Sequence, residues 1–155
     1  MDNEALKIPK RQKLVTLWVH PEGRVIGSMY LYEQSEYHSG EEQPVEVLNS
    51  EAPFLVLHRG DLDEARFYNK RSIVRVEFEA EEPADAQDLT SLRCRLHMMD
   101  GSMFEGAIRE FLDPQHRRLY DYINQTGERF VKLHVDDGRT YLVNKAYIVH
   151  IAQLD

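Results

Sequence analysis

The chain of 155 residues contains a single cysteine, Cys94, and no long run of apolar residues. One cysteine allows neither an internal disulfide nor a thiolate metal cluster. No stretch has the length and apolar character of a signal peptide or a membrane span. These absences predict a cytoplasmic protein that does not associate with a membrane.

An excess of basic residues is also missing. Residues 1–80 hold 10 Lys or Arg and 14 Asp or Glu, a net charge of −4, and the remaining residues hold 9 and 13, again −4, which together give −8. Nonspecific binding to a phosphate backbone depends on neutralising many phosphates, so this balance disfavours it. A local basic groove on an acidic protein is still compatible with the composition.

Common catalytic and cofactor-binding motifs are absent as well. There is no Gly-x-Ser-x-Gly elbow, no phosphate-binding glycine loop and no dinucleotide fingerprint. The seven histidines form no His-x-x-x-His or His-Glu pattern, and Cys94 falls on the apolar side of a predicted strand, where a thiol is inert. The sequence therefore predicts a non-catalytic protein without a metal site or a cofactor.

What the sequence does contain is an internal repeat. Val15–Val19 reappears as Cys94–Met98 at a shift of 79 residues, and Phe67–Val74 reappears as Leu142–Val149 at a shift of 75. Two more blocks align between them: Val45–Asn49 with Tyr120–Asn124, and Phe54–His58 with Phe130–His134. Four blocks in the same order indicate a duplicated unit, and a longer surface loop in the first copy accounts for the change in shift.

Alternation of apolar and polar residues predicts about five short strands in each copy. Gly27 and Gly106 fall within predicted strands, where glycine permits the sharp bends that a small closed barrel needs. The sequence leaves open whether Arg117–Gln125 forms a helical turn. We predict an all-β fold of two tandem five-stranded barrels of the Sm-like or SH3-like kind, packed together, with at most short helical turns.

Composition sets the expected domain boundaries. Residues 1–13 are polar and of mixed charge, which is typical of a frayed tail. Residues 81–91 contain Pro83 and several acidic residues, which is typical of a linker. One barrel is therefore expected at 14–80 and the other at 92–155.

Two groups of residues in the second copy have the form of known motifs. The first group is Asp100-Gly101, Phe104, Gly106, Ile108, Asp113 and Ile123-Asn124, and the second is Tyr141–Lys145, Ile148 and Ile151. They resemble the two motifs of the Sm-like family of small bent barrels, over most of residues 92–152 and more loosely over 14–78. The chain also resembles a bacterial family that has this barrel twice.

The Sm-like resemblance implies RNA binding through an asparagine and a basic residue near turns. Carried over, these are Asn124 and Lys145 in the second copy, with Asn49 and Lys70 as their counterparts. The same residues have a structural interpretation, because asparagine caps turns with its side chain and lysine is usually solvated. The sequence alone leaves both interpretations open.

The two copies agree on their inward face and differ on their outward face. Four outward positions of the first copy are apolar or aromatic: Trp18, Ile26, Tyr30 and Tyr32. Since alternate residues of neighbouring strands share a face, we expect these side chains to form one patch. Apolar patches of this kind are typical of interfaces, and Trp and Tyr are frequent at binding hot spots.

This expected patch has three interpretations. It can pack against the second copy or the 33–44 loop, it can bind a protein, or its rings can stack on nucleotide bases. Nearby charges are mostly acidic, which favours protein over RNA as the partner. We therefore predict a protein-interaction or adaptor module that binds a protein partner or self-associates through this patch, with RNA binding as the alternative.

Overall fold

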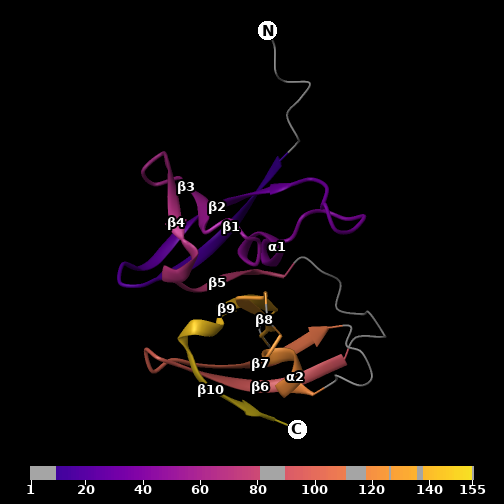
Figure 1. Cartoon of the computed structure of the whole chain (residues 1–155). Coiled ribbons are helices and arrows are strands. Elements are labelled where there is room, and N and C mark those ends of the chain that lie inside the picture. Colours follow the sequence, from indigo (N-terminus) through magenta and orange to yellow (C-terminus); the bar gives the residue numbers. More distant parts are fainter. Residues whose placement is uncertain (1–9, 81–89, 111–117, 126, 136–137, 155) are drawn as a thin grey trace.

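The computed structural model describes residues 10–80, 90–110, 118–125, 127–135 and 138–154, which form an all-β fold with short helices (Figure 1). The strands are β1 (Lys10–Val19), β2 (Gly23–Tyr32), β3 (Phe54–Arg59), β4 (Glu64–Asn69), β5 (Ile73–Glu79), β6 (Thr90–Met98), β7 (Met103–Glu110), β8 (Phe130–His134), β9 (Arg139–Asn144) and β10 (Ile148–Gln153). The helices are α1 (Pro44–Leu48), α2 (Leu119–Ile123) and the single 3-10 turns η2 (Lys70–Ser72) and η4 (Lys145–Tyr147). Residues 1–9 of the expected tail and 81–89 of the expected linker lie outside the described residues.

The strands β1–β5 and β6–β10 follow the same plan, and we call them the N-terminal and C-terminal half-sheets. Each has two strands, a short α-helix, two strands, a 3-10 turn and a fifth strand, and its first strand lies between its second and its fifth. The pairing registers agree, since Leu17 faces Val76 in one half-sheet and Leu96 faces Ile151 in the other. Positions that share a place in this plan are called corresponding positions below.

The expected all-β fold is confirmed, but two closed barrels are not. All ten strands form one open antiparallel sheet in the order β10-β6-β7-β8-β9-β5-β1-β2-β3-β4. Each half-sheet stays open between its fourth and fifth strands, because β5 pairs with β9 of the other half-sheet. The outer strands of the whole sheet are consequently β4 and β10.

Strong bending lets each half-sheet enclose an apolar core. Val15, Leu17 and Val19 alternate inward along β1 and are buried, as their spacing predicts. At the bend, a Cβ atom on Gly27 would lie 2.7 Å from the carbonyl oxygen of His58 on β3, and Gly106 is at least as closely approached. These glycines therefore allow β2 and β7 to contact the next strand without a side chain between them.

Two local features differ from the expectation. Residues 10–13 belong to β1 rather than to a tail, because β2 supplies a paired partner from Met29 to Tyr32. Helix α1 was not predicted, since five residues are too few to show a helical period. Its start has a proline in the first turn and a capping box between Gln43 and Glu46, which satisfies backbone N–H groups at the helix N-terminus.

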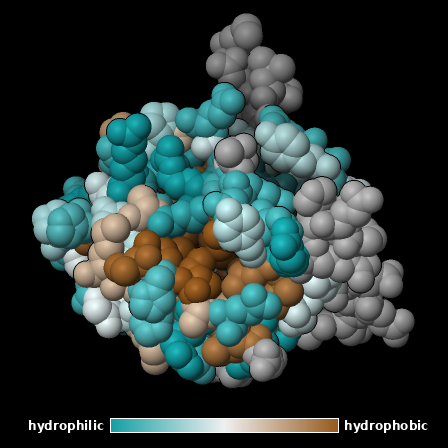
Figure 2. Space-filling model, turned by 60° about the horizontal axis from the view of Figure 1, so that its bottom comes forward, coloured by the Kyte–Doolittle hydropathy of each residue, from teal (hydrophilic) through white to brown (hydrophobic). Residues whose placement is uncertain are grey.

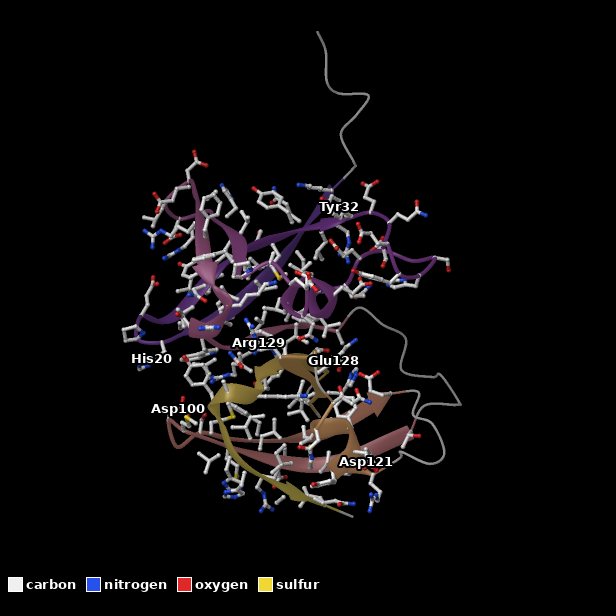
Figure 3. The ribbon with its side chains drawn as sticks, in the orientation of Figure 1. His20, Tyr32, Asp100, Asp121, Glu128 and Arg129 are labelled. Atoms are coloured by element: carbon white, nitrogen blue, oxygen red, sulfur yellow. The ribbon has the colours of Figure 1, made fainter. Side chains whose placement is uncertain are left out.

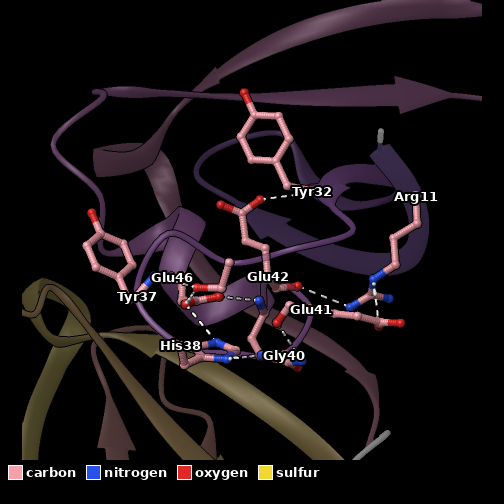
Figure 4. A network of polar contacts seen from close by, with 10 residues as sticks. Arg11, Tyr32, Tyr37, His38, Gly40, Glu41, Glu42 and Glu46 are labelled. Atoms are coloured by element: carbon pink, nitrogen blue, oxygen red, sulfur yellow. Dashed lines mark hydrogen bonds and ion pairs between the residues drawn. The ribbon is translucent and has the colours of Figure 1, made fainter. Parts of the chain in front are cut away.

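The longer loop of the N-terminal half-sheet is held by polar contacts (Figure 4). Arg11 on β1 forms an ion pair with Glu41 at 3.0 Å, and its guanidinium donates to the carbonyl oxygen of Glu42. Glu46 on α1 accepts a hydrogen bond from Ser35 and lies 3.0 Å from the His38 ring. The loop is thus fixed against α1 and the start of β1.

Candidate protein-interaction site

The two half-sheets meet where β5 pairs with β9, from Arg75 opposite Val143 to Glu79 opposite Arg139. Two asparagines complete this junction. Asn144 is fully buried, and its amide donates to the carbonyl oxygens of Lys70 and Ile73 at 3.3 and 2.9 Å. Asn49, which follows α1, accepts from the Phe130 N–H at 2.7 Å and donates to the Phe130 carbonyl at 3.2 Å. The backbone groups that these asparagines contact at the junction therefore have hydrogen-bond partners, as buried polar groups require.

Apolar side chains cross the junction in both directions. Phe130 on β8 and Leu142 on β9 are fully buried and belong to the core of the N-terminal half-sheet, with Leu48 and Val76. Val74 on β5 packs in the opposite direction, against the core of the C-terminal half-sheet. Fully burying a Leu or Phe side chain contributes about 1.5–3 kcal/mol, so this exchange stabilises the junction.

The buried arginine Arg75 lies at one side of the junction. The guanidinium of Arg75 lies 4.2 Å from the ring centre of Trp18 and 4.6 Å from that of Phe104. It also forms an ion pair with Glu77 at 2.6 Å, and Arg139 approaches Glu77 to 3.6 Å. Trp18, one of the four predicted partner-binding residues, therefore contributes to packing between the half-sheets.

The other three residues of the expected patch lie elsewhere. Trp18 pairs with Arg24, whereas Tyr30 lies six residues further along β2, a separation of about 20 Å at strand spacing. Tyr30 and Tyr32 are half-buried beside Phe54, in a depression at the far end of the N-terminal half-sheet. Ile26 is 45 % exposed and lines a different depression. Figure 3 shows Tyr32 far from Arg129, which lies between the half-sheets.

The structure therefore does not gather the four side chains into one patch. They share a face of the sheet, as alternation predicts, but β1 and β2 are each ten residues long and the four are spread along them. Sharing a face does not place residues close together when strands are this long.

An apolar groove lies instead at the C-terminal end of the sheet, between the outer strand β10 and α2. Its volume is about 470 Å³, and it is lined by Leu119, Tyr120, Ile123, Asn124, Lys145, Ile148, Val149, His150, Ile151 and Gln153. Figure 2 shows hydrophobic side chains gathered in a hollow on this end of the molecule. Val149 is 60 % exposed there, so the groove presents apolar surface to solvent beside a strand edge.

The four residues named for RNA binding are divided between two environments. Lys70 is fully buried, and its ammonium donates to the Val47 carbonyl at 2.6 Å and to the Ser50 carbonyl and hydroxyl at 3.2 and 2.9 Å. Burial lowers the Lys70 pKa, and the charge of Arg129 lowers it further. Because Asn49 is bound to Phe130, both residues of this pair serve the interior of the fold.

Asn124 and Lys145, in contrast, both line the groove. The Lys145 ammonium donates to the Gln125 carbonyl at 3.1 Å, and the Asn124 amide donates to the Tyr120 carbonyl at 2.8 Å. Partial burial lowers the pKa of Lys145, and the charge of Glu128 opposes that shift. Lys70 and Lys145 thus do not form one basic groove.

Other candidate sites carry little chemistry. The described ranges contain no group of three His, Cys, Asp or Glu side chains placed to hold a metal ion, and none of their helices is long and apolar enough to cross a bilayer. His97 and His150 stack with ring centres 4.1 Å apart. Cys94 is fully buried, and burial raises the pKa of its thiol to about 11, against the influence of Arg93.

Comparison with protein-family models, curated proteins and solved structures finds no match to this chain. The alternation of residues predicted about five strands in the second copy but did not indicate this groove. The sequence feature that could have indicated the groove is the pair Ile148 and Val149 in β10. Two consecutive apolar residues place apolar side chains on both faces of a strand.

Proposed function

We propose that the protein is a non-catalytic protein-interaction module of two Sm-like units that binds an extended protein segment along β10, in the groove against α2. The observation that carries this proposal lies in the other half-sheet. There, the corresponding space between β5 and α1 is occupied by β8 and β9, with Phe130 and Leu142 in the core. The groove between β10 and α2 has the same arrangement of elements, so it is suited to bind an extended chain segment of the same kind.

Backbone chemistry supports an extended ligand. The outer edge of β10 carries N–H and C=O groups that an added strand can pair with, as in β-augmentation. Apolar side chains beside the edge supply the second component of such binding, because alternate residues of an added strand can enter the groove. Val149 occupies the position of Val74, which packs across the internal junction.

Charge favours a protein over a nucleic acid. Lys145 is the single Lys or Arg among the described residues that line the groove, and the chain carries a net charge of −8. Nucleic-acid binding would need several cations to neutralise phosphates. RNA remains the second candidate because Asn124 and Lys145, the residues implied by the family resemblance, lie together in this groove.

A peptide that copies residues 128–146 tests the proposal, because this segment fills the corresponding site inside the chain. We expect the peptide to protect β10 amide protons from hydrogen exchange, and a scrambled peptide to leave them unchanged. Val149→Asp should abolish the protection. The matched control is Leu14→Asp, since Leu14 is 67 % exposed on β1, away from the groove.

RNA binding is measured in the same way with oligouridine at low salt. Protection of β10 by the RNA but not by the peptide would overturn the protein-binding proposal in favour of the alternative. If neither ligand protects β10, the groove has no binding function of either kind.

A further inference from the structure

The stacked histidines on the outward face of the C-terminal half-sheet belong to a row of three side chains. His150 on β10 pairs with His97 on β6, and His97 pairs with Met103 on β7. Residues that lie opposite each other in an antiparallel pair point to the same face, with Cβ atoms about 4.5–5.5 Å apart. The pairing therefore places two imidazoles and a thioether side by side across three strands.

These side chains are close to one another and accessible from solvent. The ring centres of His97 and His150 are 4.1 Å apart. His97 is half-buried, His150 is exposed, and Met103 is 52 % exposed. Among the described residues, no hydrogen bond or ion pair engages either imidazole ring. The nitrogen and sulfur atoms of the row are therefore available to a ligand.

We propose that His97, His150 and Met103 form a binding site for monovalent copper. Imidazole nitrogen and thioether sulfur are donors that suit this soft ion. The planes of the two rings are inclined by 26°, so their nitrogen lone pairs do not converge in the stacked arrangement. Rotation about the Cβ–Cγ bond, a broad torsion in histidine, brings one nitrogen of each ring to about 2.0 Å from a shared ion, the usual metal–imidazole distance.

The third donor selects the ion. Within the described ranges, no further His, Cys, Asp or Glu side chain completes a three-membered metal-binding group with the two histidines. Zinc sites in proteins take three or four ligands from those residue types, so two histidines alone are a poor zinc site. The sulfur of Met103 is a soft donor, which favours monovalent copper over divalent zinc.

The charges around the row permit a monovalent cation. Arg95 and Glu105, the next outward residues on β6 and β7, form an ion pair at 2.9 Å, so their charges offset each other. Burial, then His150, then Arg95 lower the pKa of His97. An imidazole must be neutral to bind a metal ion, and a lowered pKa keeps His97 neutral at pH 7. Any remaining repulsion from Arg95 is half as large for a monovalent ion as for a divalent one.

The corresponding row of the N-terminal half-sheet has the same pairing but different chemistry. Its residues are Arg75, Trp18 and Arg24. The Arg75 guanidinium lies 4.2 Å from the centre of the Trp18 ring, much as the His150 ring stacks on His97. Arginine and tryptophan side chains offer donors of hydrogen bonds but no acceptor nitrogen. We therefore expect one copper ion per chain, in the C-terminal half-sheet.

Anaerobic titration with monovalent copper, in competition with a chromophoric copper chelator, measures the affinity. The parent protein is the Cys94→Val chain, because a thiol also binds monovalent copper. His97→Gln and His150→Gln should each raise the dissociation constant at least about 100-fold, since loss of an outer-shell partner alone costs 10–100-fold. Met103→Leu should raise it about 10-fold, because a thioether is the weakest of the three donors.

His20→Gln and Met99→Leu are the matched controls. Both replaced residues are exposed and lie outside the row, so the affinity should not change, and circular dichroism checks that every variant is folded. Unchanged affinity in His97→Gln and His150→Gln would overturn the proposal. An equally large loss in His20→Gln would do the same, because the copper would then be bound elsewhere.

X-ray absorption at the copper edge identifies the ligands directly. Copper in the parent chain should have nitrogen neighbours at about 2.0 Å together with one sulfur neighbour, and Met103→Leu should remove only the sulfur. If the parent chain shows no sulfur neighbour, or binds zinc as tightly as monovalent copper, the histidines act without Met103 and the proposed copper site is wrong.

Copper that joins β10 to β6 should also hold this outer strand in place. At free copper 100 times its dissociation constant, β10 amide protons that exchange when β10 detaches should exchange about 100-fold more slowly. Unchanged exchange in the copper-loaded chain would contradict the bridge between the strands.

The copper site and the groove can be separated by two variants. His97→Gln should remove the protection by copper and leave the protection by the 128–146 peptide. Val149→Asp should remove the protection by the peptide and leave the protection by copper. The proposed function can therefore fail while the copper site stands, and the copper site can fail while the proposed function stands.

Discussion

Phe54 and Phe130 occupy corresponding positions in the two half-sheets, yet the first is 52 % exposed and the second 1 %. Both begin the third strand of their half-sheet and both face away from their own core. Phe130 is covered because β5 lies next to β9, whereas β4 is an outer strand. The environment of these identical residues is set by which strand lies alongside them, and not by their local sequence.

The lysines of the 3-10 turns show the same contrast. Lys70 is fully buried beneath α1 with three oxygen partners, whereas Lys145 is half-buried and donates to Gln125 alone among the described contacts. The surrounding turn is alike in both, since the Lys70 and Lys145 N–H groups each donate to a backbone carbonyl at 2.9 Å. The difference between the two lysines comes from packing at the junction, which makes Lys70 an interior residue.

The largest expected effect comes from truncating the two phenylalanines. Phe130→Ala should lower the free energy of unfolding by about 3–5 kcal/mol, because it leaves a cavity in the N-terminal core. Phe54→Ala should lower it by less than about 1 kcal/mol, since the side chain is already half in solvent. Urea denaturation at low protein concentration measures both values, and equal losses would contradict the difference in burial.

The second comparison uses the asparagines that precede the 3-10 turns. Asn144→Ala removes the donor for two carbonyls at the junction. A buried group left unsatisfied costs about 1–3 kcal/mol, and the 3.3 Å bond to Lys70 is the longer of the two, so we expect a loss of about 2–4 kcal/mol, below the full sum for two groups. Asn69→Ala removes only a turn cap and should cost about 0.5–1 kcal/mol. The same denaturation assay applies, and Asn144→Leu, which keeps nearly the same size but has no amide donor, separates the hydrogen bonds from packing.

The third comparison replaces each lysine by methionine, which preserves most of the aliphatic chain. Lys70→Met leaves the oxygens of Val47 and Ser50 without their donor, and we expect a loss of about 1–3 kcal/mol. Lys145→Met should change stability by less than about 0.5 kcal/mol, as is usual for a partly exposed position. A larger effect at Lys145 than at Lys70 would mean that the buried lysine is not required for packing α1.

Sequence alone was sufficient for the parts of this fold that depend on local pattern. Period-two alternation predicted about five strands in each copy, in agreement with the ten strands described, and the central glycines Gly27 and Gly106 lie at the bends. The open sheet was not predictable, because alternation shows which residues face inward but not which strand lies beside β5. For the same reason Trp18 was expected in a surface patch, whereas Arg75, brought from β5, covers its ring.

The last comparison concerns Cys94, whose corresponding residue in the N-terminal half-sheet is Val15. Both side chains are buried, so Cys94→Val should change stability by less than about 1.5 kcal/mol at pH 7. Burial raises the pKa of the Cys94 thiol from 9.0 to about 11. Between these values the unfolded chain loses the thiol proton while the folded chain retains it, so stability falls as the pH rises.

The valine variant lacks this proton and should avoid the loss. At pH 10.5 we expect the wild-type chain to have lost about 2 kcal/mol relative to the variant, compared with their difference at pH 7. Urea denaturation of both proteins at the two pH values measures this change, because all other titrating groups are shared. Parallel pH profiles would mean that the Cys94 thiol ionises as readily in the folded chain as in the unfolded one, and that the C-terminal core is more accessible to water than the corresponding core around Val15.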